Sequence, residues 1–288
     1  MAPHYGSMNY LKATGILNMP RFVHISDLHF GREQPEVIAG WFKITAELQP
    51  DLIIISGDLT QRATDTEYLA AQQFLSQLPW PYFVIPGNHD MSATDLAERF
   101  FKPWKKWQHY IAPDLEPVLD LEHTRIVGVN TARAAGFYFD WSRGQISDQQ
   151  ITAVQQKFQE TAATRLKIVV AHHPFWLPKN SEYRDVVERR DQAIAAFHDA
   201  GVDLILSGHV HTAYTQILQG VLIVHSGTSF SNRLSQGQAN SFNLIQGDHT
   251  HLTIQFMHWN GQRFQSTEQR EFQHTQGVWQ QTAGLNSV

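Results

Sequence analysis

The 288-residue chain contains no cysteine, which excludes disulfide bonds and thiolate metal sites. It also has no apolar run near the roughly 20 residues that a membrane-spanning helix needs, so we expect no integral membrane segment. Positive charge is scarce: the net charge is −5 and the pI is about 6.3. This balance argues against a broad basic surface for nucleic acid. It suits a cytoplasmic enzyme that acts on a small molecule.

Histidine, by contrast, is abundant, with 16 residues. Imidazole is the commonest metal ligand in proteins and titrates near neutral pH. With 42% hydrophobic residues, the chain is able to bury a substantial core. Residues 1–19 have no apolar stretch of the kind that a signal peptide needs. We therefore expect an N-terminal tail over 1–19, a single domain over 20–275 and a C-terminal tail over 276–288.

Short apolar runs alternate with segments of helical spacing, as in βαβ units. The runs predict strands over 21–26, 51–56, 82–85, 124–130, 166–171, 202–208 and 221–227. Helices are expected over 36–48, 64–78, 147–161 and 190–201, with short helices and loops over 92–118. From 241 to 272, polar and apolar residues alternate between turn signals, which predicts an antiparallel β-meander. The fold class is therefore α/β, followed by a C-terminal meander.

Five of the predicted strands are followed by side chains of the metal-ligand type. These side chains are Asp27, His29, Asp58, Asn88, His172, His209 and His211. Each short motif alone would be ordinary capping of a strand end. The carboxyl ends of parallel strands share one edge of a sheet, where ligands bind. Recurrence at five strand ends therefore favours a single shared site.

Taken in order, these motifs closely resemble the five signature motifs of the calcineurin-like metallophosphoesterases. They read Asp-x-His, Gly-Asp, Gly-Asn-His-Asp, His-His-Pro and Gly-His-x-His, and the similarity runs from about residue 20 to 230. The segments "HISDLHFG" and "SGHVH…HSGT" are most similar to bacterial class III cyclic-nucleotide phosphodiesterases and related glycerophosphodiesterases. The resemblance implies a four-layer α-β-β-α sandwich.

The resemblance also implies two divalent or trivalent metal ions. One would be held by Asp27, His29, Asp58 and His211, and the other by Asp58, Asn88, His172 and His209. Asp58 would bridge the two ions. Carboxylate, imidazole and amide ligands suit Mn, Fe or Zn, and the choice among them stays open.

In "GNHD", residues 87–90, three side chains of different chemistry follow one strand. We expect Asn88 to bind a metal and to lie against the substrate. His89 is the candidate catalyst, which would bind the phosphate or protonate the leaving group. For Asp90 two interpretations have equal weight: it orients the His89 ring, or it caps a helix that begins near 92–94.

The expected activity is hydrolysis of a small phosphodiester, with a 3′,5′-cyclic nucleotide such as cAMP as the leading candidate. Alternatives are a phosphomonoesterase and a pyrophosphohydrolase of nucleotide-sugar lipids of the UDP-diacylglucosamine type. A nuclease is disfavoured by the acidic pI. Outside enzymes, the alternative is a scaffold protein that keeps the fold without catalysis, but the full ligand set and His89 disfavour it. The oligomeric state, including a homodimer, stays open.

Substrate specificity is less constrained by the sequence. Aromatic residues at 100–110 and 136–141 would either cap the site or form a local core, and we favour a core role for Phe100, Phe101 and Trp104. Three arginines follow motif segments and would either reach a phosphate or lie on a solvated surface. They are Arg32, Arg62 and Arg233.

Overall fold

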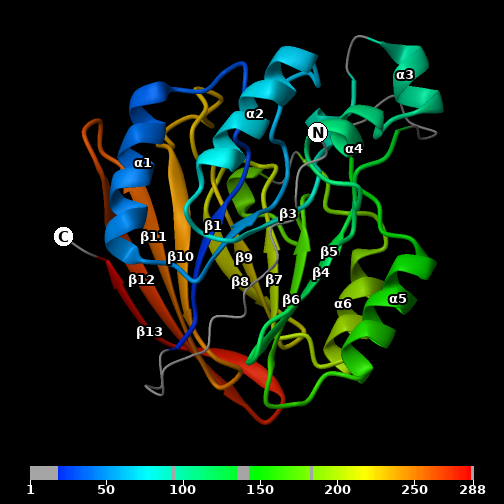
Figure 1. Ribbon diagram of the computed structural model, residues 1–288. Coiled ribbons are helices and arrows are strands. Elements are labelled where there is room, and N and C mark those ends of the chain that lie inside the picture. The colour runs from blue at the N-terminus through cyan, green and yellow to red at the C-terminus, as the bar shows by residue number, and fades with distance from the viewer. Residues whose placement is uncertain (1–18, 93–94, 135–142, 182–183, 287–288) are drawn as a thin grey trace.

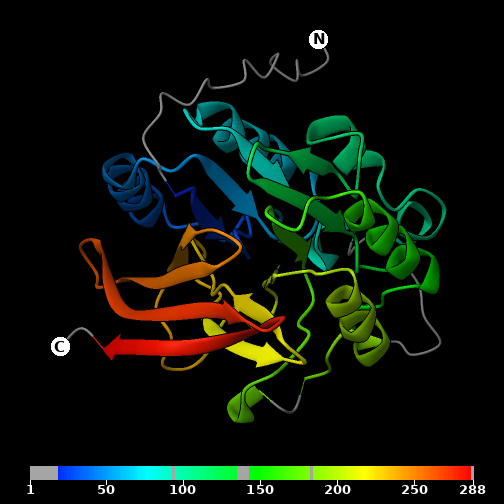
Figure 2. The ribbon, with the colours of Figure 1, turned by 90° about the horizontal axis from the view of Figure 1, so that it is seen from below.

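Two β-sheets pack face to face and carry helices on their outer faces (Figures 1 and 2). The computed structural model describes residues 19–92, 95–134, 143–181 and 184–286. The first sheet has the strand order β13-β12-β11-β10-β1-β2-β3, and the second has the order β4-β5-β6-β7-β9-β8. This arrangement confirms the expected α-β-β-α sandwich.

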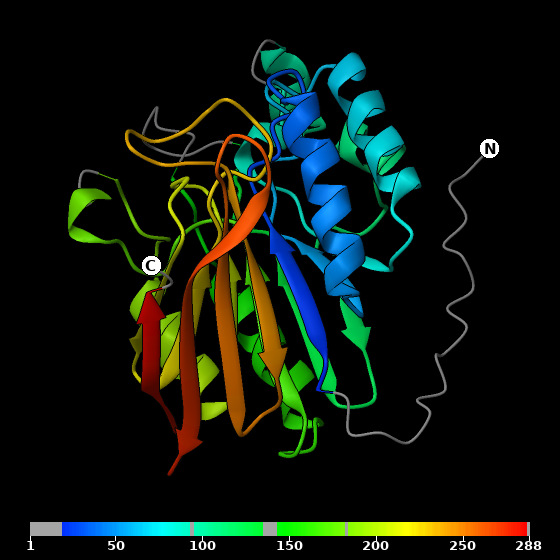
Figure 3. The same cartoon turned by 90° about the vertical axis from the view of Figure 1, so that its left-hand side faces the viewer.

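The first sheet joins a parallel part to an antiparallel one. Its parallel strands are β1 (Arg21–Ile25), β2 (Leu52–Ile55) and β3 (Tyr82–Val84). Its antiparallel strands are β10 (Ser241–Gly247), β11 (His251–Trp259), β12 (Phe264–Thr275) and β13 (Val278–Asn286). Figure 3 shows this meander continuing the sheet on one side of β1. The expected meander is therefore present.

The second sheet is parallel in its centre and antiparallel at both edges. The parallel strands are β5 (Thr124–Val129), β6 (Leu166–Ala171), β7 (Leu204–Ser207) and β9 (Val221–His225). The edge strands are β4 (Val118–Asp120) and β8 (Tyr214–Leu218). The sequence analysis missed both edge strands, because edge strands are partly solvated and lack a continuous apolar run.

The described helices are α1 (Pro35–Leu48), α2 (Asp65–Gln77), α3 (Leu96–Phe101), α4 (Lys105–Tyr110), α5 (Asp148–Gln159) and α6 (Arg190–Asp199). Helices α1 and α2 cover the outer face of the first sheet, and α5 and α6 cover that of the second. Short 3₁₀ turns η1 (Asn88–Asp90) and η2 (Lys179–Ser181) complete the described elements. Helix α2 begins with a capping box, in which the Thr64 hydroxyl accepts from Glu67 N and the Glu67 carboxylate accepts from Thr64 N.

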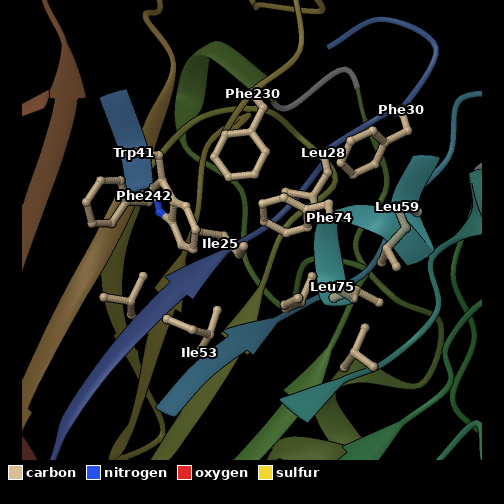
Figure 4. Packing of buried hydrophobic residues seen from close by; sticks show 14 of the residues in the cluster. Ile25, Leu28, Phe30, Trp41, Ile53, Leu59, Phe74, Leu75, Phe230 and Phe242 are labelled. Carbon is tan, nitrogen blue, oxygen red and sulfur yellow. The ribbon is translucent and has the colours of Figure 1, made fainter. Parts of the chain in front are cut away.

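Three apolar clusters fill the spaces between the four layers. One lies between α1, α2 and the first sheet, where Trp41, Phe74 and Phe230 pack together (Figure 4). A second lies between the two sheets and includes Ile54 and Ile168. The third lies between the second sheet and helices α5 and α6. Because both faces of each parallel strand are covered, these strands read as continuous apolar runs.

The C-terminal boundary at residue 275 was wrong. Residues 278–286 form β13, which pairs with β12 along its length. The strand "VWQQTAGLN" is a polar edge strand, and it is anchored to the inter-sheet core by Trp279, which is 2% exposed. A polar edge strand shows little hydrophobic alternation, so its sequence resembles a tail. Among the described residues, no helix combines the length and the apolar character that crossing a membrane would require.

Candidate metal centre and active site

The seven ligand-type residues all lie in loops at the carboxyl ends of strands. Those after β1, β2 and β3 come from the first sheet, and those after β6 and β7 come from the second. All seven are buried. The structure brings six of them into two groups, each with three ligand atoms within 4.8 Å of one another. The convergence expected from the strand ends is therefore present.

The first group consists of Asp27, His29 and His211. His211 Nε2 lies 3.2 Å from Asp27 Oδ1 and 3.3 Å from His29 Nε2. His29 Nε2 lies 3.7 Å from the same Asp27 oxygen. Asp27 Oδ1 is buried and has no hydrogen-bond partner of good geometry among the described residues. A buried carboxylate oxygen that faces two imidazole nitrogens is suited to a cation between them.

The second group consists of Asp58, His172 and His209. His172 Nε2 lies 3.2 Å from Asp58 Oδ2, and His209 Nδ1 lies 3.1 Å from Asn88 Oδ1. The same Asp58 oxygen lies 3.8 Å from His29 Nε2 of the first group. Asp58 Oδ2 therefore lies near a histidine nitrogen of each group.

The backbone at this site adopts conformations that side-chain-bearing residues rarely adopt. Five of the ligand-type residues have φ between 46° and 80°. They are Asp27, His29, Asp58, His209 and His211. A left-handed conformation costs roughly 1–2 kcal/mol per residue, and such strain gathers at functional sites. The geometry of this edge is therefore maintained against a local conformational cost.

Glycine directly precedes Asp58, Asn88 and His209. The loops pack too closely for a side chain at these glycine positions. A Cβ at Gly57 would lie 2.7 Å from His172 Nδ1. A Cβ at Gly208 would lie 1.8 Å from Ser26 Oγ. A Cβ at Gly87 would lie 2.2 Å from Asp58 Oδ1. The glycines of the Gly-Asp, Gly-Asn-His-Asp and Gly-His-x-His motifs thus allow the strand ends to approach one another.

Backbone carbonyls orient two of the histidines. His172 Nδ1 lies 2.8 Å from Ser56 O, and His29 Nδ1 lies 3.3 Å from Thr60 O. A carbonyl oxygen only accepts, so each Nδ1 carries the hydrogen and donates it. Nε2 of each ring is therefore the nitrogen that faces the acidic groups, and it is the atom that would bind a metal once deprotonated.

The electrostatics of the site favour a positive charge at its centre. Burial alone would raise the pKa of Asp27 and of Asp58, but neighbouring histidines hold both well below their usual range. Burial lowers the pKa of His172, yet the Asp58 carboxylate outweighs it and raises that pKa to about 9. Burial also lowers the pKa of His209, which keeps its ring neutral. Two ionised carboxylates that raise the pKa of one neighbouring histidine create an environment that favours cations.

His89 lies at the rim of the two groups. Its Nδ1 donates to Gln61 O at 2.8 Å, and its Nε2 accepts from Arg233 Nη1 at 3.0 Å. Its ring is edge-on to that of His29, with ring centroids 5.0 Å apart. Burial, together with His29 and Arg233, lowers the pKa of His89 against the influence of Asp58. The ring is therefore neutral and faces the site through Nε2.

Neither interpretation of Asp90 holds in the structure. Its carboxylate accepts hydrogen bonds from the backbone N–H groups of Leu59 (3.2 Å), Thr60 (2.8 Å) and Gly87 (2.9 Å). These hydrogen bonds link the loops after β2 and β3, so the carboxylate does not contact the His89 ring. The N-cap of α3 is Asp95.

The Gln61 carbonyl orients His89 instead. Sequence reasoning missed Gln61, although it directly follows the "GDLT" motif. Every residue has a backbone carbonyl, so the contact of one carbonyl with a distant ring cannot be predicted from the types of side chain.

The aromatic residues near position 100 divide between core and surface. Trp104 packs against the cluster beneath α1 and α2, as expected. Phe100 and Phe101 are 48% and 84% exposed, so the core role expected for them was wrong. Helix α3 buries Arg99 instead, whose guanidinium donates to backbone carbonyls. The aromatic segment 136–141 lies outside the described residues.

A family model named calcineurin-like phosphoesterase matches residues 20–213. The chain therefore belongs to this family and is a phosphoester-hydrolysing enzyme, and the family depends on a dinuclear metal centre. The identification by motif is confirmed.

Among curated proteins, the chain is similar to a probable cyclic nucleotide phosphodiesterase of Coxiella burnetii. The two are 26% identical over 69% of this chain and 78% of that protein. A probable glycerophosphodiester phosphodiesterase of Arcobacter nitrofigilis is 24% identical over 61% of this chain and 62% of its own length. A dimetal phosphatase structure from Danio rerio aligns with a TM-score of 0.66 and 9% identity, over 90% of this chain and all of that one. That likeness shows the shared fold.

Proposed function

We propose that the protein is a dinuclear-metal phosphodiesterase that hydrolyses a small phosphodiester, with a 3′,5′-cyclic nucleotide such as cAMP as the leading substrate. The observation that carries this proposal is the position of Asp58. Its Oδ2 lies 3.2 Å from His172 Nε2 in one group and 3.8 Å from His29 Nε2 in the other. A carboxylate between two sets of nitrogen donors suits two cations at close range. The names of the curated relatives support the diester class.

In this proposal two sets of four residues would hold the metals, and Asp58 would belong to both. One set is Asp27, His29, Asp58 and His211, and the other is Asp58, Asn88, His172 and His209. When bound, a pair of Mn, Fe or Zn ions lowers the pKa of a water and offsets charge on the phosphoryl oxygens. Asn88 contributes a neutral oxygen, which limits the negative charge that an anionic substrate meets.

His89 lies beside the metal ligands without being assigned as a ligand, with its ring centroid 5.0 Å from that of His29. Its ring is fixed by the Gln61 carbonyl at Nδ1, so Nε2 is the atom that meets the substrate. Its Nε2 accepts from Arg233 Nη1 in this structure, so His89 takes up a proton at Nε2 before it donates to a phosphoryl oxygen or protonates the leaving alkoxide. Asp90 acts indirectly, by holding the loops that carry Asp58 and Asn88 at their present separation.

The test is turnover by protein reconstituted with Mn²⁺. We expect hydrolysis of bis(p-nitrophenyl) phosphate and of cAMP, with slower hydrolysis of p-nitrophenyl phosphate. Glycerophosphocholine, a glycerophosphodiester, distinguishes the two classes named for the relatives. Asp58→Asn should lose bound metal and activity together, whereas Asp203→Asn, which changes a buried carboxylate of the second sheet, should lose neither. A fully metallated wild type that hydrolyses no diester would refute the proposal.

A further inference from the structure

Arg233 reaches the candidate active site from a part of the chain that carries none of the ligand residues. It lies in the loop between β9 and β10, and its Nη1 is 3.0 Å from His89 Nε2 and 3.4 Å from Gln61 Oε1. The side chain is half-buried. Arg32 and Arg62, the other arginines that follow motif segments, are exposed. Among the described residues, Arg233 is the one of these three arginines that forms a hydrogen bond with His89.

The loop that carries Arg233 is firmly attached to the fold. Phe230 is buried in the cluster with Trp41 and Phe74, and its carbonyl accepts from Gln34 N at 2.9 Å. The Thr228 hydroxyl donates to the carbonyl of Arg233 itself at 3.0 Å. These contacts determine where the arginine backbone lies, so its side chain is directed to the site by the structure of the loop.

A further attachment comes from Asn240 at the end of this loop. Its Nδ2 donates to Ser231 O at 2.8 Å, and the Asn240 side chain is buried. Its Oδ1 accepts from Gln34 Nε2 at 3.0 Å, which links the loop to the start of α1. The two ends of the loop are therefore held independently of any substrate.

The charge of Arg233 is not balanced by a carboxylate. Among the residues that the structure describes, its guanidinium forms no ion pair and contacts only the neutral groups of His89 and Gln61. By contrast, the half-buried Arg133 is paired with Glu188 at 3.1 Å. A partly desolvated guanidinium without a counter-charge is suited to an anionic ligand.

The geometry of the guanidinium leaves donors for such a ligand. Both hydrogen bonds of the guanidinium use Nη1. Within the described part of the chain, Nε and Nη2 form no hydrogen bond. These two nitrogens form the planar fork that binds two oxygens of a phosphate at once.

We propose that Arg233 is a substrate-binding residue that donates from Nε and Nη2 to phosphoryl oxygens. The proposal rests on the proposed phosphodiesterase function for its choice of anion.

The experiment compares Arg233→Gln and Arg233→Lys with the control Arg62→Gln in Mn²⁺-loaded protein. We measure KM and kcat for bis(p-nitrophenyl) phosphate, the dissociation constant of inorganic phosphate by calorimetry, and metal bound per chain. Arg233→Gln should weaken phosphate binding and raise KM about tenfold to hundredfold, as the loss of charge-assisted hydrogen bonds predicts. Metal content should match the control. Arg233→Lys should recover part of the loss, because it restores the charge without the fork.

Two results would overturn the assignment. One is unchanged phosphate affinity in Arg233→Gln. The other is a fall in kcat with KM and phosphate affinity unchanged, which would make Arg233 a positioning residue for His89. Phosphate binding is measured without turnover. The role of Arg233 and the proposed phosphodiesterase function are therefore tested independently. A wild type that binds phosphate through Arg233 but hydrolyses no diester would refute the proposed function and support the role of Arg233.

Discussion

Gly87→Ala tests whether the closeness of the loops, and not only the identity of the ligands, builds the site. Gly87 has φ of −112°, a value that alanine adopts without strain, so any effect must come from the added methyl group. That carbon would lie 2.2 Å from Asp58 Oδ1 and 2.5 Å from Asp58 N. Real contacts of this kind stay above 3.0 Å. The loop that carries Asn88 must therefore move away from the loop that carries Asp58.

The size of the effect follows from this displacement. Overpacking of a buried site costs about 1–3 kcal/mol of unfolding free energy, which corresponds to a fall of roughly 2–12 °C in Tm for a domain of this size. Misplacement of reacting groups by about 1 Å costs on the order of 100-fold in rate. We expect Gly87→Ala to lower kcat/KM by about that factor and to weaken metal binding.

The assay combines urea unfolding, metal analysis and diester hydrolysis. Gly284→Ala is the matched control: it lies on the exposed edge strand β13, where the added carbon meets only the flexible Gln281 amide at 3.0 Å. We expect it to change unfolding free energy by less than about 0.5 kcal/mol. If Gly87→Ala unfolds, binds metal and turns over like this control, the close approach of the loops is not what shapes the site.

Three further changes give distinct readouts. His89→Ala should keep both metals and lower kcat by about 10²–10⁴-fold; loss of metal would show that His89 is a ligand. Thr64→Ala should cost about 1 kcal/mol of unfolding free energy through loss of the capping box, and a shift within 0.2 kcal/mol would contradict this. Burial raises the pKa of Asp203 from 3.8 to about 6, so its contribution to stability is full below pH 3.8 and is lost as pH rises through 6. Between pH 4 and 7, unfolding free energy should therefore fall by about 2 kcal/mol more in the wild type than in Asp203→Asn, and parallel profiles would refute this.

The ligand set was predictable because its signal is local. Each ligand-type residue follows a short apolar run, and the run alone indicates a buried strand whose end faces the common edge. The bridging role of Asp58 followed from the family resemblance and stays a prediction; in the structure its Oδ2 lies near Nε2 of His29 and of His172. The capping box at Thr64 is also a local feature, because it involves only four consecutive residues.

What the sequence could not predict depends on contacts between distant segments. The direction of the Asp90 carboxylate depends on how close the loop at Leu59 and Thr60 lies, and this separation is a property of sheet packing. The contact of Arg233 with His89 spans 144 positions. The strand β13 is held by pairing with β12 and by one buried tryptophan, which its polar sequence does not indicate.

The division of the ligands between two sheets has a consequence for the order of assembly during synthesis. Asp27 and His209 are joined directly, since His209 N donates to Asp27 Oδ2 across 182 positions. The strand β1, which precedes Asp27, also pairs with β10, so its place in the sheet is completed only after residue 247 has been made. Contacts over such separations form late, because loop closure must precede them. Metal loading is therefore expected to follow the meeting of the two sheets, and bound metal would report a chain that has finished folding.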